Sequence, residues 1–423
     1  MPHAALVWVK SRRSVPLLGL GVAVVAVVAV VAVSAGHRWA STTTPPPARV
    51  AIRVPCEPAG ACDLAASLAS DVWSEHRSPA MPLDVVVTAD ALARLAAAGV
   101  TWEVLVPDID AEARAERARL RAPAAARPAD WFADYRDYRA TTTYLHQLAE
   151  LAPGRATVHG IGSSVEGRTI WALRIGGGAP DATPMLINGT QHAREWIATM
   201  VSTCVADRLV RGYDHDPAIR DFVDHTELWV VPVVNPDGYQ HSWAQDRYWR
   251  KNRRGRHGVD LNRNFGVAWG GDGSSSRERS EVYRGEHPFS EPETRALRDL
   301  ALRERVALHI DFHAYGQLVL YPWGYTASPT RDRDRFAALG DRMASAIFAA
   351  HQTRYRLMSA VQLYPASGTM SDWMYGEANA LSYTIELRPT GRGGFVLPPS
   401  EIRPTCDEGL AAVLALRAAH RGN

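Results

Sequence analysis

Two histidines and two glutamates carry the strongest chemical signal in this chain: His192, Glu195, His313 and Glu386. His192 and Glu195 belong to the sequence Gln-His-Ala-Arg-Glu-Trp, which directly follows a strand-like run at residues 185–188. Two imidazoles and one carboxylate can hold a catalytic zinc ion and leave its fourth position open to water. Such a metal lowers the pKa of that water and polarises a carbonyl group. With Glu386 as a second carboxylate, the pattern points to hydrolysis of an amide.

The surrounding sequence places these residues at the ends of buried strands. The apolar runs 306–312 and 381–387 predict short strands; His313 follows the first, and Glu386 lies within the second. A carboxylate among apolar neighbours is costly unless it has a partner or a task. In open α/β sheets, functional sites gather at the carboxyl ends of strands. This context matters, because the bare His-x-x-Glu spacing is most often a solvated pair at the start of a helix.

Further motifs follow one another along the last two-thirds of the chain. They are Gly160-Ile-Gly-Ser-Ser-Val-Glu-Gly-Arg168, Asn235-Pro-Asp-Gly-Tyr239, Tyr248-Trp-Arg-Lys-Asn252, Gly258-Val-Asp-Leu-Asn-Arg-Asn-Phe265, Tyr283-Arg-Gly285, Phe289-Ser-Glu-Pro-Glu293, Asp311-Phe-His-Ala-Tyr315, Leu363-Tyr-Pro-Ala-Ser-Gly368 and Glu386-Leu-Arg388. Through these motifs the chain from about Trp131 onward resembles the zinc carboxypeptidases of the pancreatic carboxypeptidase A/B type and their secreted bacterial relatives. The resemblance implies an α/β fold, with a mixed central sheet covered by helices on both faces.

The resemblance assigns the metal site to residues already singled out. His192, Glu195 and His313 would bind one zinc ion per chain. Asp260 matches the carboxylate that would accept the free ring N–H of His192 and so set its tautomer. His309, four residues before His313, is better interpreted as a core or solvated histidine than as a further ligand.

The resemblance also implies removal of C-terminal residues from peptides. Glu386 would be the general base that takes a proton from water and passes it to the leaving amine. Arg250 would stabilise the oxyanion as it forms. Asn262 and Arg263 would grip the terminal carboxylate of a peptide or protein, because the planar guanidinium can bind a carboxylate through two parallel hydrogen bonds. Tyr364 would close over the bound substrate.

The residues expected to contact substrate side chains favour a neutral or apolar C-terminal residue. In the resembling family, the pocket takes much of its character from the residue before an Asp-Trp pair, which is Ser371 here. An acidic residue at that place selects Lys or Arg. Other pocket positions carry small, uncharged side chains, namely Ser359, Ala366 and Thr384. The outer subsites would be lined by Arg194 and Tyr315.

Two other functions fit parts of the sequence. One is cleavage of bacterial cell-wall peptides by an enzyme of the same fold. The other is an anchored, inactive peptide-binding module. The complete set of zinc ligands argues against it, as do Glu386 and Arg250. The formal net charge of +2 gives no case for nucleic-acid binding.

The N-terminal part of the 423-residue chain predicts export from the cytoplasm. Basic residues precede an apolar run at 15–35, and a Thr/Pro linker at 37–47 follows it. Residues 1–36 are therefore either a cleaved secretory signal or an uncleaved membrane anchor, since 21 apolar residues can span a bilayer as a helix. Both alternatives make the enzyme secreted or extracytoplasmic, with membrane contact only through this segment.

A small α+β domain is expected at residues 48–110, before the catalytic domain at 130–423. Strands are predicted at 50–54, 83–87 and 101–106, and helices at 63–73 and 89–98. In the resembling family, such a segment is an open-sandwich pro-domain. The connecting segment 111–129 is rich in Ala and Arg. Exposed arginines there would suit activation by a trypsin-like protease.

The four cysteines suggest disulfides rather than metal binding, because His and Glu already fill the zinc site. Cys56 and Cys62 bracket a loop short enough to close locally, and extracytoplasmic location favours that bond. Whether Cys204 and Cys406 meet stays open at this point. The resemblance also implies cis peptide bonds at Ala314–Tyr315, Pro322–Trp323 and Arg388–Pro389.

Overall fold

The computed structural model describes residues 49–74, 81–121 and 130–421. The segment expected to be a signal or anchor (1–36) and the Thr/Pro linker (37–47) lie outside these residues. Within the described part of the chain, no helix is long and apolar enough to cross a membrane.

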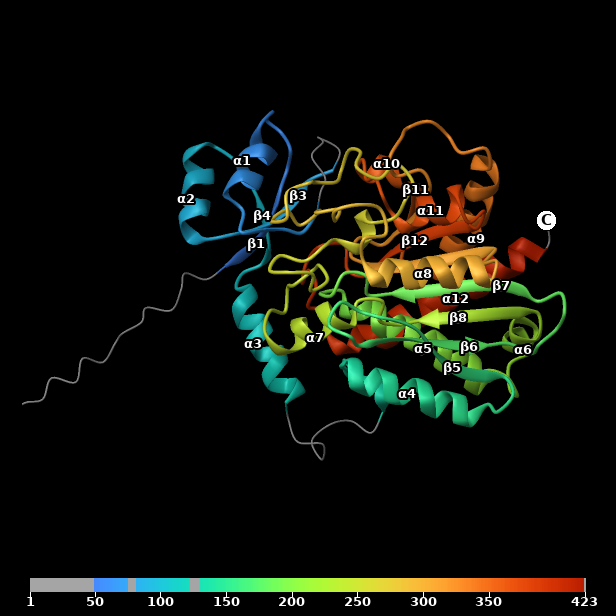
Figure 1. The fold of residues 1–423 in the computed structure, drawn as a ribbon. Coiled ribbons are helices and arrows are strands. Elements are labelled where there is room, and N and C mark those ends of the chain that lie inside the picture. Colours follow the sequence, from blue (N-terminus) through green and yellow to red (C-terminus); the bar gives the residue numbers. More distant parts are fainter. Residues whose placement is uncertain (1–48, 75–80, 122–129, 422–423) are drawn as a thin grey trace, which may run out of the picture. The chain divides into compact units, whose positions relative to one another are not determined.

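An eight-stranded mixed sheet lies at the centre of residues 130–421, with the strand order β11-β10-β12-β9-β7-β8-β6-β5 (Figure 1). The strands are β5 (Ala156–Ser163), β6 (Thr169–Ile175), β7 (Thr183–Gly189), β8 (Thr226–Val231), β9 (Leu308–Ala314), β10 (Leu318–Tyr321), β11 (Arg356–Ser359) and β12 (Leu381–Leu387). The four central strands β12, β9, β7 and β8 run parallel. Their carboxyl ends therefore meet at one edge of the sheet.

Helices cover both faces of this sheet, as expected for the α/β class (Figure 1). Successive side chains of a strand point to opposite faces of the sheet and belong to two hydrophobic cores. On β7, Met185 and Ile187 belong to the core on one face, and Leu186 belongs to the core on the other. The first face is covered by α4 (Tyr138–Leu151), α5 (Trp196–Gly212), α6 (Pro217–Asp224), α9 (Arg333–His351) and α12 (Ile402–Arg421). The second is covered by α8 (Pro292–Arg303) and α11 (Met370–Gly376). Two further helices are α7 (Pro236–Ala244) and α10 (Ala360–Leu363).

The small N-terminal domain is an antiparallel sheet with helices, which confirms the expected α+β pro-domain fold. Its strand order is β2-β3-β1-β4. The elements are β1 (Val50–Val54), α1 (Ala61–Leu68), β2 (Asp71–Val72), β3 (Leu83–Val87), α2 (Ala89–Ala97) and β4 (Glu103–Val106). Helix α2 begins where predicted, because the Thr88 side chain accepts the Ala91 N–H.

One helix of this domain is shorter than expected. The sequence predicts a helix at 63–73, but α1 ends at Leu68 and the chain continues into the edge strand β2. The Ser70 and Trp73 N–H groups donate to backbone carbonyls of β3 at 2.8 Å each. Pairing with the sheet therefore overrides the local helix propensity of this stretch.

The connecting segment begins as a helix, α3 (Ile109–Leu120). The Asp108 carboxylate caps it by accepting the Ala111 N–H at 2.8 Å. The rest of the Ala/Arg-rich segment, residues 122–129, lies outside the described residues.

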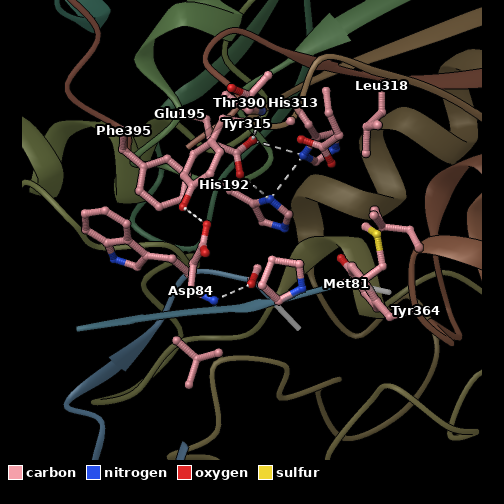
Figure 2. Close-up of a pocket in the computed structure, with 18 of the residues that line it drawn as sticks. Met81, Asp84, His192, Glu195, His313, Tyr315, Leu318, Tyr364, Thr390 and Phe395 are labelled. Carbon is pink, nitrogen blue, oxygen red and sulfur yellow. Dashed lines mark hydrogen bonds and ion pairs between the residues drawn. The ribbon is translucent and has the colours of Figure 1, made fainter. Parts of the chain in front are cut away.

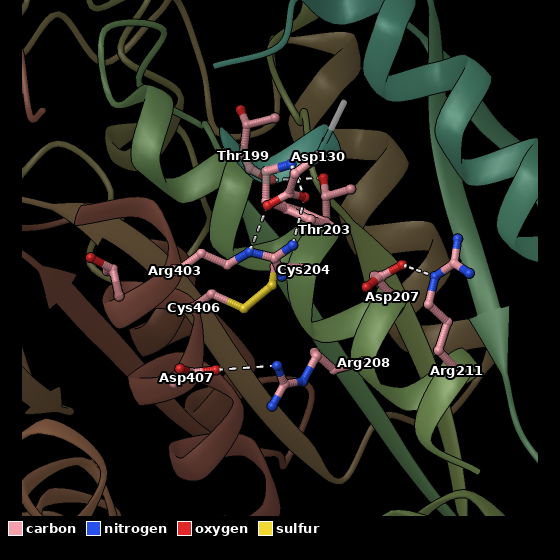
Figure 3. The surroundings of a disulfide bond; sticks show 12 residues. Asp130, Thr199, Thr203, Cys204, Asp207, Arg208, Arg211, Arg403, Cys406 and Asp407 are labelled. Atoms are coloured by element: carbon pink, nitrogen blue, oxygen red, sulfur yellow. Dashed lines mark hydrogen bonds and ion pairs between the residues drawn. A yellow bond between two sulfur atoms is a disulfide. The ribbon is translucent and has the colours of Figure 1, made fainter. Parts of the chain in front are cut away.

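Both disulfides form in the described structure. Cys56–Cys62 closes the loop between β1 and α1, and Cys204–Cys406 joins α5 to α12 (Figure 3). The second bond settles a pairing that the sequence left open. The three expected cis peptide bonds are also present, at Ala314–Tyr315, Pro322–Trp323 and Arg388–Pro389.

Candidate active site

The three zinc ligands converge at the carboxyl edge of the central strands. His192 and Glu195 lie between β7 and the first turn of α5, and His313 is the penultimate residue of β9. Glu195 Oε1 lies 2.8 Å from His192 Nδ1, and its Oε2 lies 3.0 Å from His313 Nδ1. The two Nδ1 atoms are 3.1 Å apart. Figure 2 shows these side chains directed toward one another.

This arrangement fits a zinc ion. His192 Nε2 lies 3.1 Å from a carboxylate oxygen of Asp260, and His313 Nε2 lies 2.9 Å from one of Asp311. An Nε2–H that donates to a carboxylate leaves the opposite Nδ1 as a bare lone pair. Two such lone pairs and the carboxylate of Glu195 therefore converge, and all three ligand residues are buried. Zinc bonds of about 2.0–2.2 Å set tetrahedral ligand atoms roughly 3.4 Å apart, close to the observed spacing.

Asp260 and Arg250 form a pair beside the ligands. The Asp260 carboxylate accepts the Arg250 guanidinium at 2.9 Å and the Asn262 backbone N–H at 3.0 Å, in addition to the ring of His192. Burial disfavours the charged form, but Arg250 and His192 outweigh it and hold the pKa of Asp260 well below its usual value. Asp260 thus orients an imidazole and a guanidinium at once.

A tight loop brings Arg250 and Asp260 together. The Asn252 side-chain carbonyl accepts the backbone N–H groups of Arg254 and Val259, which closes the loop. Gly258 has a φ of +71°, and a Cβ there would lie 2.3 Å from the Asn252 carbonyl oxygen. Only glycine fits at this position, which accounts for its place in the sequence motif.

Glu386 lies beside the zinc ligands on β12, where it pairs in register with His313 on β9. It lines the same cavity as the ligands and Arg250. Burial raises the pKa of Glu386 to about 8. A bound dication would lower this pKa, because it favours the charged carboxylate.

The cavity above the zinc ligands has a volume of about 310 Å³, and residues of the small domain line part of it. Arg194 is fully buried, and its guanidinium lies 2.9 Å from the Asp71 carboxylate of β2. The Tyr315 hydroxyl donates to Asp84 of β3 at 2.8 Å (Figure 2). Both residues expected at the outer subsites therefore contact the small domain.

The residues expected to grip the substrate carboxylate are only partly assembled at the cavity. Asn262 and Tyr364 line it. Arg263 is buried beside them, with its guanidinium 5.8 Å from the centre of the Tyr364 ring. Its Nε donates to the Gly273 carbonyl and one terminal nitrogen donates to the Asn262 carbonyl, each at 2.8 Å.

Ser371 lies buried in the first turn of α11, next to the element that carries Asn262. The Met370 N–H donates to the Asn262 side-chain oxygen at 2.9 Å. Asp372 is the nearest acidic residue in sequence, but it is fully buried and its carboxylate accepts the Gly324 N–H at 2.9 Å. Burial raises the pKa of Asp372 to about 7.

Comparison with known proteins identifies the family, since residues 141–412 match the family model for zinc carboxypeptidases. The chain belongs to the zinc carboxypeptidase family. It is 38% identical to carboxypeptidase B of Astacus astacus, over 66% of this chain and 94% of that protein. It is 36% identical to metallocarboxypeptidase A of Trichophyton tonsurans, over 83% of this chain and 88% of that protein. The solved structure of carboxypeptidase A from Helicoverpa armigera has a TM-score of 0.79 and 30% identity, and the match covers 89% of this chain and 98% of that one.

These findings show a zinc metallocarboxypeptidase of the A/B type, with its zinc site formed by His192, Glu195 and His313. The relatives are animal and fungal proteins, so the expected bacterial kinship gains no support from them. The resemblance seen in the sequence therefore holds for the A/B type.

Sequence reasoning missed two groups of residues around the site. The first is Asp311, whose carboxylate lies 2.9 Å from Nε2 of His313. Its position two residues before a zinc ligand, inside a sequence motif, was the signal that could have found it. Three residues of the small domain contact the catalytic domain beside the site, and no local pattern in the sequence marks them: Asp71 meets Arg194, Trp73 meets Tyr248 and Asp84 meets Tyr315. His309 is a buried core residue, as expected, and belongs to no metal cluster found among the described residues.

Proposed function

We propose that this metallocarboxypeptidase removes neutral or apolar C-terminal residues from peptides, by water attack that Glu386 promotes. The observation that carries the proposal is the placement of Glu386 and Arg250 in the cavity lined by the zinc ligands. Bound zinc would supply Lewis-acid chemistry, since it lowers the pKa of a water ligand and polarises a carbonyl.

The protein residues then have distinct tasks. The Glu386 carboxylate accepts a proton from the attacking water and passes it to the leaving amine, so its burial beside the ligands places the base next to the reaction. The Arg250 guanidinium donates to the oxygen on which negative charge develops. Because Asp260 holds both Arg250 and His192, the donor is oriented before the substrate binds.

Exopeptidase selectivity rests on Asn262, Arg263 and Tyr364. Two of these line the cavity, and the third lies directly behind them. A peptide carboxylate that displaces the backbone contacts of Arg263 would gain a charge-assisted pair of hydrogen bonds. Tyr364 would close over that end of the peptide.

The preference for a neutral side chain rests on Ser371 itself, an uncharged residue at the position that sets the character of the pocket in the resembling family. Selection of Lys or Arg would need a carboxylate that faces the pocket, and the adjacent carboxyl of Asp372 is bonded to the backbone instead. The relatives compared above include both a carboxypeptidase A and a carboxypeptidase B, so the proposed preference rests on the residues of the pocket.

The small domain keeps the uncut enzyme slow on long peptides. Asp71 and Asp84 occupy Arg194 and Tyr315, the residues proposed for the outer subsites. A trypsin-like cut in the connecting segment (111–129) would release the domain (48–110) from the catalytic part (130–423). Disulfides form and persist outside the cytoplasm, which supports an extracytoplasmic enzyme whose segment 1–36 is a signal or an anchor.

Kinetics on matched peptides test the proposal. The protease-cut enzyme should hydrolyse a peptide ending in Phe or Leu faster than one ending in Lys or Arg, and an amidated peptide poorly. Arg263→Ala should raise KM and lower kcat, because the clamp both binds and positions the substrate. Equal rates on free-acid and amidated peptides would refute the clamp, and a strong Lys or Arg preference would refute the neutral pocket. Faster cleavage of cell-wall peptides would favour the cell-wall alternative.

A further inference from the structure

A buried polar network lies under the zinc site, and Asp311 is at its centre. Asp311, Asn188, Gln191, His309 and Ser382 are all fully buried. They come from β7, β9 and β12, adjacent strands of the sheet, and from the turn that follows β7. Polar groups at this depth must satisfy one another, because no water competes for them.

The hydrogen bonds of the network form a chain of donors that ends at the Asp311 carboxylate. Gln191 Nε2 donates to Asp311 Oδ2 at 2.5 Å, and Asn188 Nδ2 donates to Oδ1 at 2.6 Å. The Asn188 side-chain carbonyl is then free to accept His309 Nε2–H at 2.7 Å. His309 Nδ1 in turn accepts the Ser382 hydroxyl at 2.7 Å. Amide groups have one donor and one acceptor end, so this sequence of partners fits a single orientation.

The remaining contact of the carboxylate is with a zinc ligand. Asp311 Oδ2 lies 2.9 Å from His313 Nε2. A carboxylate can only accept, so this contact favours the tautomer of His313 that carries its proton on Nε2. That tautomer leaves the Nδ1 lone pair facing Glu195 and the metal position. Asp260 has the same relation to His192, at 3.1 Å.

We propose that Asp311 is a positioning residue of the zinc site, which sets the tautomer and ring orientation of His313 through a carboxylate that Asn188 and Gln191 hold in place. Both zinc imidazoles then have their own carboxylate partner. Removing such a partner typically weakens metal binding 10–100-fold, because the ligand loses basicity and orientation. The proposal concerns metal binding and does not depend on the peptide preference proposed above.

An exchange of side chains separates this role from simple packing. Asp311→Asn alone removes the charge but also leaves amide donors facing one another. The double variant Asn188→Asp/Asp311→Asn keeps one carboxylate, one amide and a hydrogen bond between positions 188 and 311. It moves the charge away from His313. Ser382→Ala is the matched control, because it cuts the far end of the network and leaves Asp311 untouched.

Zinc affinity is measured on the full chain by competition with a chromophoric chelator, and the cobalt-substituted proteins are compared by visible absorption. We expect the double variant to bind zinc 10–100-fold more weakly and to show an altered cobalt spectrum, while Ser382→Ala binds zinc like the wild type. Wild-type zinc affinity in the double variant would overturn the proposal. A test on the wild type needs no substitution: ¹⁵N-histidine NMR of the zinc enzyme should show a protected Nε2–H on His313, and its absence would also overturn the proposal. Peptide selectivity is measured separately, so failure of either proposal is distinguishable.

Discussion

Replacement of Trp73 by alanine should release the latency of the uncut enzyme. The Trp73 ring stacks on Tyr248 with ring centres 5.3 Å apart, and Phe395 lies against it at 5.2 Å. Its indole N–H donates to the Asp71 carboxylate at 2.9 Å, and that carboxylate pairs with Arg194. Trp73 thus takes part in the apolar contact between the two domains, and it also holds the carboxylate of the ion pair at the proposed outer subsite.

The expected size of the effect follows from the burial of this side chain. Trp73 is 7% exposed, and a tryptophan buries about 150–250 Å². At about 25 cal/mol per Å², the upper limit is ~4–6 kcal/mol. Hot-spot residues at interfaces, among which tryptophan is enriched, cost ~2 kcal/mol or more when they are truncated. Even this lower figure raises the population of the released state about 30-fold.

The assay compares kcat/KM on a long peptide for the intact chain and for the protease-cut chain. Trp73→Ala should raise the intact rate by about one order of magnitude or more, toward that of the cut enzyme. Trp73→Phe should lie between, and Val104→Ala, at an exposed position of β4, should have no effect. The reasoning is refuted if intact and cut wild-type enzymes are equally active, or if Trp73→Ala leaves the intact rate unchanged.

Two further predictions concern stability. Burial raises the pKa of Glu293 to about 7 from 4.5, so its stabilising contribution is complete below pH 4.5 and is lost as the pH rises through 7. The melting temperature of Glu293→Gln should therefore fall less than that of the wild type between about pH 5 and pH 8, and equal pH slopes would contradict this. Replacing Cys204 and Cys406 with alanine, which opens a link across 202 residues, should cost ~2–5 kcal/mol, more than opening Cys56–Cys62 across 6 residues. Thermal unfolding measures both, and a larger loss at the shorter loop would count against the chain-entropy argument.

The zinc site could be predicted from the sequence because its parts are local. His192 and Glu195 are three residues apart, and apolar runs marked β9 and β12 to within a few residues. The run that predicted β9 ended at Phe312, two residues before the strand does, and His313 lies inside the strand. Neighbouring parallel strands then place His313 and Glu386 at the same edge.

Contacts between distant segments could not be read from the sequence. Asp71 meets Arg194 across 123 residues, and Cys204 meets Cys406 across 202. The end of α1 was misplaced for the same reason, since pairing with β3 decides it. The contacts of Asp311 with Gln191 and Asn188 span 120 and 123 residues, and no local pattern pairs these positions.

The central claim is that His192, Glu195 and His313 bind zinc while Glu386 moves the proton. Glu386→Gln tests it most directly, through zinc content and kcat measured on the same preparation after removal of the small domain. We expect one zinc per chain with kcat lowered by about 10²–10⁴-fold or more, since the variant keeps the ligands and loses the base. A Glu386→Gln enzyme that holds its zinc and cleaves C-terminal residues at the wild-type rate would contradict the account.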